Sequence, residues 1–201
     1  MIMQLRIFMS CLSLLLTGSL LSQDTTRWLT VEPNHSTIGF RVPISGGVTL
    51  VTGKFTDFDL ELQLVNEDWT KSKATFTIEA ESINTGISDR DQHLRSADFF
   101  EVEKYPNITF TSEKIKRIDD SLYEATGTFS MHGVSKEITL PFEILGYDGK
   151  SIGIQIRTKL NRIDYGVGSN FKHTTTPNFL AKEIDVEINF WTRRDKRKPK
   201  N

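Results

Sequence analysis

Apolar side chains recur at every second position over most of the chain, the pattern of β-strands with one buried face. In residues 58–64, for example, Asp59, Glu61 and Gln63 alternate with apolar residues. Segments with this pattern are 38–42, 58–64, 74–80, 108–110, 123–131, 138–144, 152–160 and 184–190. Turn-like stretches such as Gly46-Gly47 separate them. We therefore predict an all-β fold of eight antiparallel strands, either a barrel or a sandwich.

The alternation is interrupted by one long stretch, residues 85–106. Ser88 is followed three residues later by Asp91, which approximates a capping box, and Leu94 supplies an apolar contact. The stretch therefore predicts a short helical segment between strands, covering about residues 89–102.

The first residues are typical of a secretory signal peptide. Arg6 precedes an apolar stretch, residues 7–21, that is short for a membrane-spanning helix. We predict cleavage after residues 1–22 and a periplasmic or secreted protein. The single cysteine, Cys11, would be removed, so the mature chain is expected to have neither disulfides nor thiolate metal sites.

The remaining chain is predicted to be one domain, residues 23–192, followed by a basic tail, residues 193–201. The tail holds six Lys and Arg residues and one acid, Asp195. Such a tail is either solvated or drawn transiently to an anionic membrane surface. The formal net charge of the whole chain is −1, and we expect no nucleic-acid partner.

Eight alternating strands fit either an outer-membrane barrel or a soluble one. A membrane barrel usually ends in a strand, whereas this chain continues after Trp191 with basic hydrophilic residues, so we expect the soluble form. The interior of such a barrel is either filled by side chains or holds one small ligand, and periodicity does not decide between them. A deeply buried ligand should be apolar, because few inward positions offer a polar partner.

Motifs for catalysis or cofactor binding are missing from the sequence. Residues 166–170 lack the glycine-flanked serine of a nucleophile elbow, and neither a phosphate-binding nor a dinucleotide-binding glycine run occurs. Asp89 and His93 share the spacing of two metal ligands on a helix, but no third ligand is evident. We therefore expect neither a metal nor a cofactor, and a protein that is not an enzyme.

Two adjoining runs, residues 89–100 and 104–112, closely resemble the central signature of the YceI-like family. Further family marks follow the same order along the chain: His35-Ser36, 53–59, 127–129, 132–136 and 162–166. The similarity spans residues 28–192, and only residues 169–182 are hard to match. The resemblance implies an extended, lipocalin-like, eight-stranded antiparallel barrel whose tunnel takes an isoprenoid quinone or a polyprenyl phosphate.

The resemblance also suggests site residues. Aromatic side chains are the candidates for the tunnel lining: Phe40, Phe55, Phe58, Phe76, Phe99, Phe110, Phe129, Phe142 and Tyr165. Asp91, His93 and Arg95 are the candidates for holding a polar head group, although the two charged residues could equally stabilise the helix. The leading hypothesis is non-catalytic binding, storage or transport of the lipid. Its rivals are an enzyme acting on a bound lipid or quinone and a secreted scaffold with a packed core; dimerisation stays open.

Overall fold

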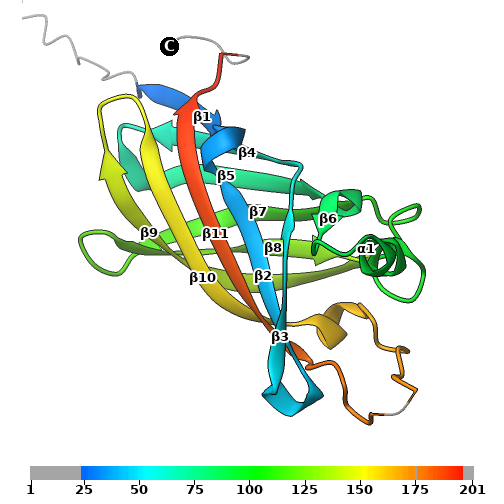
Figure 1. The fold of residues 1–201 in the computed structure, drawn as a ribbon. Helices are drawn as coiled ribbons and strands as arrows, with labels where there is room; N and C mark the ends of the chain where they lie inside the picture. Colours follow the sequence, from blue (N-terminus) through cyan, green and yellow to red (C-terminus); the bar gives the residue numbers. More distant parts are fainter. Residues whose placement is uncertain (1–23, 175, 197–201) are drawn as a thin grey trace, which may run out of the picture.

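Eight strands form a closed antiparallel ring in the computed structural model, which describes residues 24–174 and 176–196 (Figure 1). Their order is β1 (Thr26–Val31), β4 (Phe58–Val65), β5 (Asp68–Glu79), β7 (Asn107–Arg117), β8 (Leu122–Met131), β9 (Val134–Tyr147), β10 (Ile152–Asn161) and β11 (Glu183–Arg194). The ring closes where β1 pairs with β11. This confirms the predicted all-β, eight-stranded antiparallel barrel. The predicted signal peptide, residues 1–22, and residues 197–201 of the predicted tail lie outside the described residues.

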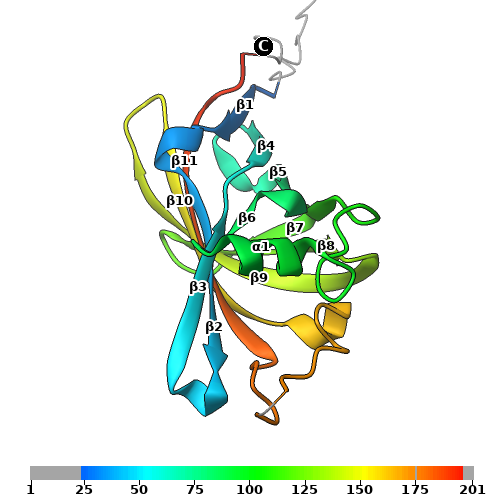
Figure 2. The same cartoon turned by 45° about the vertical axis from the view of Figure 1, so that its right-hand side comes forward.

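Two chain segments share the free edge of β11. β1 pairs with residues 192–194, and β2 (Thr37–Ile44) pairs with residues 185–189 after the 3₁₀ turn η1 (Pro33–His35). From β2 the chain passes through η2 (Ser45–Gly47) into β3 (Thr49–Phe55), which ends beside β6 (Ile83–Asn84); η3 (Ala80–Ser82) precedes β6. This branch leaves the ring. Figures 1 and 2 show the β2–β3 hairpin extending away from the end at which β11 finishes.

The predicted helical segment is shorter than expected. Helix α1 spans Ser88–Arg95, and its N-cap is Ile87, so the predicted Ser88–Asp91 capping box does not form. Residues 97–104 form hydrogen-bonded turns instead of a second helical stretch, since the Glu101 N–H returns to the Ser96 carbonyl and Glu101 adopts a positive φ of 47°. The chain then enters β7 after η3, β6 and α1 have crossed one end of the barrel.

The alternating pattern positions the core. Along β8 every second residue is buried, from Tyr123 to Met131, while the residues between them are more exposed. Gly127 lies on the buried side, opposite an irregularity in β7 between Ser112 and Lys114. A Cβ on Gly127 would lie 2.1 Å from the Thr111 carbonyl oxygen, so β7 and β8 can pair here only with glycine.

Gly127→Ala is expected to lower the free energy of unfolding by about 3 kcal/mol, because the backbone of β7 must move to admit the methyl group. Chemical denaturation measures this change. Gly146→Ala in β9 is the matched control: a Cβ there meets nothing within 4 Å, so we expect a change of less than about 1 kcal/mol. Equal stability of the two variants would contradict the close approach of β7 and β8.

Candidate functional site

One end of the barrel is filled with side chains. Trp69, Tyr123 and Phe142 pack against one another there, with ring centroids 5.4 Å apart for the stacked Tyr123–Phe142 pair. Leu62 and Leu64 of β4 are almost fully buried at the same end, where β1 closes the ring. This half of the interior is a packed core.

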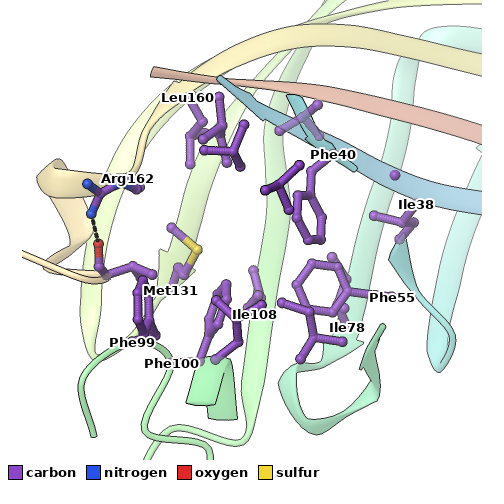
Figure 3. Close-up of a pocket in the computed structure, with 18 of the residues that line it drawn as sticks. Ile38, Phe40, Phe55, Ile78, Phe99, Phe100, Ile108, Met131, Leu160 and Arg162 are labelled. Carbon is purple, nitrogen blue, oxygen red and sulfur yellow. Dashed lines mark hydrogen bonds between the residues drawn. The ribbon is translucent and has the colours of Figure 1, made fainter. Parts of the chain in front are cut away.

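The other end is hollow. A cavity of about 450 Å³ is lined by β2 over most of its length, by the first halves of β7, β9 and β11, by the last halves of β5, β8 and β10, and by residues of α1, β3 and β6. Figure 3 shows its wall, with Phe40 and Phe55 on one side and Met131 and Arg162 on the other. The two interiors that the periodicity left open therefore occur together, one at each end.

Five of the nine predicted aromatic residues line this cavity: Phe40, Phe55, Phe76, Phe99 and Phe129. The other four lie outside its wall. Phe110 stacks on Phe76 with ring centroids 5.4 Å apart, and Phe58 packs on Phe190. Phe142 belongs to the packed end, and Tyr165 packs edge-on against Phe129. Burial raises the pKa of the Tyr165 phenol, and Asp164 adds to the rise. Contact of any of these residues with a ligand stays a prediction.

The three predicted head-group residues separate into one at the cavity and two away from it. His93 lines the cavity, with its Nε2 2.9 Å from Asp98 Oδ2 and its ring edge-on to Phe99. Asp91 is buried and accepts hydrogen bonds from the backbone and hydroxyl of Thr85. Arg95 donates to the carbonyls of Glu81 and Ile83, at 2.7 and 2.9 Å. Asp91 and Arg95 thus fasten α1 to the segment around β6.

Asp89 and Arg90 of α1 were not predicted to face the cavity, yet both line it beside His93. The Arg90 guanidinium donates to the side-chain and backbone oxygens of Thr85. The helical spacing of residues 89, 90 and 93 could have indicated a shared face, but the sequence does not say which face of α1 meets the barrel. Among residues 24–174 and 176–196, no three His, Cys, Asp or Glu side chains are grouped to hold a metal ion.

Arg162 is the polar residue most deeply embedded in the wall, and sequence reasoning missed its role. It begins the 3₁₀ turn η4 (Arg162–Tyr165), directly after β10, and is only 8% exposed. Its guanidinium donates to four backbone carbonyls, those of Ala181, Val167, Gly168 and Leu180, at 2.7 to 3.3 Å. Burial lowers its pKa from the ordinary arginine value.

These four hydrogen bonds shape the mouth of the cavity. They join the turn after η4 to the chain that leads into β11, and both segments carry apolar lining residues, such as Val167 and Leu180. All Asp and Glu residues of the chain are among the described residues, and none of their carboxylates lies within ion-pair distance of Arg162. Carbonyl dipoles alone therefore compensate the buried charge.

A second, more polar cleft of about 400 Å³ adjoins this mouth. Residues 168–174 and 176–182 supply most of its lining, and it shares Arg162, Phe171, Phe179 and Leu180 with the apolar cavity. His173 stacks on Phe179 with ring centroids 4.1 Å apart, and its Nδ1 accepts from the backbone N–H of Thr176. The described residues include no helix long and apolar enough to cross a membrane.

The closed ring, the β2–β3 branch and the cavity at one end define an extended antiparallel β-barrel with an internal cavity. The chain belongs to the YceI-like domain family, whose pattern it matches over residues 29–191. Protein YceI of Escherichia coli O157:H7 is 33% identical over 162 residues, which cover 78% of this chain and 81% of that protein. Protein YceI of Salmonella arizonae is 31% identical over the same coverage.

Solved structures share the fold. The YCEI protein of Campylobacter jejuni is 32% identical, with a TM-score of 0.65, and the match covers 74% of this chain and 88% of that one. A structure described as a polyisoprenoid binding domain from Saccharophagus degradans, implicated in plant cell wall breakdown, is 18% identical with a TM-score of 0.69, over 84% and 99% of the two chains. BcnA of Burkholderia cenocepacia is 20% identical with a TM-score of 0.72, over 81% and 98%.

Arg162→Ala is expected to lower the free energy of unfolding by about 3 kcal/mol, because buried carbonyls lose a charged donor. Denaturation measures the loss, and hydrogen exchange should show faster exchange in residues 166–182. The control is Arg117→Ala. The Arg117 side chain is 55% exposed and pairs with Asp120, so its removal should lower the free energy of unfolding by less than about 1 kcal/mol. Unchanged exchange in the 166–182 segment would show that Arg162 does not hold the mouth.

Proposed function

We propose that the protein binds a long apolar lipid of the isoprenoid class in the hollow end of the barrel and stores or transports it without chemical change. The observation that carries this proposal is the cavity itself, whose walls are almost entirely aliphatic and aromatic, with few polar residues. Ligand cavities in proteins are of similar size and character.

Hydrophobic burial would supply the affinity. Each square ångström of apolar ligand surface removed from water contributes about 25 cal/mol, and an extended hydrocarbon has little other surface to offer. The ionisable side chains in the lining, Asp89, Arg90, His93 and Arg162, all belong to α1 and η4. This arrangement suits a molecule with one polar head, such as an isoprenoid quinone or a polyprenyl phosphate.

Non-catalytic binding is favoured by how the polar groups are occupied. Four of the five N–H groups of Arg162 donate to carbonyls, Arg90 donates to Thr85, and His93 lies next to Asp98, which is 65% exposed. A hydrolase would need a nucleophile within hydrogen-bond reach of a base. Likeness in fold to a polyisoprenoid binding domain supports the same ligand class. We further propose that the chain acts after export, because residues 1–22 are typical of a signal peptide.

Met131→Trp should abolish binding, since Met131 is 5% exposed and its side chain points into the cavity, where an indole would occupy the space of the ligand (Figure 3). The protein is purified, extracted with organic solvent and analysed by mass spectrometry, before and after incubation with a long-chain isoprenoid alcohol or quinone. Ile118→Trp, at a site 44% exposed beyond β7, is the control and should bind as the unmodified protein does.

Two results would contradict the proposal. One is that no apolar compound is recovered from the unmodified protein after incubation. The other is recovery of a chemically altered ligand, which would indicate an enzyme. Thermal denaturation of each variant shows whether Met131→Trp remains folded, and a smaller filling substitution, Met131→Phe, should reduce rather than abolish binding.

A further inference from the structure

Two segments that are distant in the sequence form a continuous rim at the cavity mouth. We call them the lip: residues 42–53 of the β2–β3 hairpin, and residues 176–181 of the chain leading to β11. The Ser45 N–H donates to the Phe179 carbonyl at 2.8 Å, and the Ala181 N–H donates to the Pro43 carbonyl at 3.0 Å. Because backbone hydrogen bonds join the segments, the lip is one structural unit.

The hairpin side of the lip carries apolar side chains both toward the cavity and toward solvent. Val42, Ile44 and Val51 line the cavity, whereas Val48 is 85% exposed and Leu50 is 49% exposed. Not one residue from 42 to 53 is charged. Exposed strands in water normally carry charged side chains, so a projecting hairpin of this composition indicates a surface that something covers.

Basic side chains flank the lip on both of its segments. Arg41 and Lys54 border the hairpin, and Lys172 and Lys182 border the other segment; all four are exposed. Residues 41–54 and 169–182 contain no acid, although the whole chain has 26 acidic and 25 basic residues. Acids follow just beyond these residues: Glu183 is adjacent to Lys182 and pairs with Lys159, and Asp185 lies 4.0 Å from Arg41. The surface that covers the lip should therefore have negatively charged groups outside and an apolar layer beneath them.

We propose that the lip docks on the surface of an anionic lipid bilayer. Val48 and Leu50 enter the boundary between head groups and acyl chains, where apolar side chains are favoured and water still reaches the backbone. The flanking basic side chains attract anionic head groups. The cavity mouth then faces the bilayer, so this proposal goes beyond ligand binding to where a ligand enters and leaves.

A second copy of the chain is a less suitable occupant. The outer edge of β3 pairs with β6 only at Lys54 and Phe55, so residues 49–53 could in principle extend a sheet between two molecules. In a symmetric antiparallel pair of residues 49–53, Lys54 of each copy would lie opposite Val48 of the other. The lip contains no acid, so a second lip offers the flanking basic side chains no ion pair.

The apolar contribution is tested by flotation of the purified protein with vesicles of phosphatidylglycerol and phosphatidylcholine. The double variant Val48→Ser, Leu50→Ser should lower the vesicle binding constant about 10-fold or more, since burying one such side chain is worth about that factor. Leu145→Ser in β9, which removes a side chain 56% exposed, is the control and should leave binding unchanged. All variants retain residues 193–201, so a difference cannot come from the basic tail.

The electrostatic contribution is tested with Lys172→Gln, Lys182→Gln. Binding to the anionic vesicles should weaken, most strongly at low ionic strength, while any binding to pure phosphatidylcholine vesicles should not change. Lys114→Gln, Lys116→Gln on β7 removes the same charge from exposed positions distant from the lip and is the control. Equal loss in both lysine pairs would overturn the proposed orientation.

Other outcomes would overturn the proposal outright: no flotation of the unmodified protein, or flotation unaffected by the Val48 and Leu50 substitutions. Sedimentation that reveals a dimer lost in the same double variant, without vesicle binding, would assign the lip to a second copy instead. Extraction of lipid from the double variant separates the two proposals. If the double variant still binds lipid in its cavity but no longer floats, the role of the lip in docking is supported. If the unmodified protein floats but binds no lipid in its cavity, only the proposed function is rejected.

Discussion

The hydrogen bonds along β11 determine the shape of the molecule. On one edge β11 pairs continuously with β10, from Asn161 to Gly153, but on the other edge it meets two separate segments, β1 and β2. β1 turns toward β4 and closes the ring, whereas β2 continues into the hairpin with β3. The interior is therefore narrow and packed below β1, and wide and hollow beside β2. Both the cavity and the packed core thus follow from the way that one edge of β11 is shared between β1 and β2.

The same division of strand pairing explains how the polar groups at the hollow end are hydrogen-bonded. The connections there are long, and their polar groups must be satisfied close to an apolar cavity. Arg162 does this for the segment before β11, and Asp91 and Arg95 do it for the segment around β6. Each charge is met by neutral hydrogen-bonding groups, most of them in the backbone, rather than by an opposite charge. A buried charge solvated by dipoles keeps the mouth in one conformation while leaving little hydrogen-bonding capacity for a ligand.

Alternation predicted the barrel because most ring strands have one buried face, as in β8. The eight predicted segments nevertheless included 38–42, which is β2 of the branch, and omitted β1. In β1, Leu29, Thr30 and Val31 are all buried, since the Thr30 hydroxyl donates to Asp59, so no alternation is visible. β3 was missed because most of its residues are exposed, and β6 because it has two residues.

The site was less predictable than the fold for a geometric reason. Periodicity tells which face of a strand a side chain occupies, but not its depth along the barrel axis. Phe76 and Phe142 both point inward, yet one lines the cavity and the other belongs to the packed end. The same limit applies to polar residues, because Asp91 and His93 share α1 and face different neighbours. Binding strength at such a site comes from area rather than from polar contacts, so the depth of the hollow decides which ligand length fits.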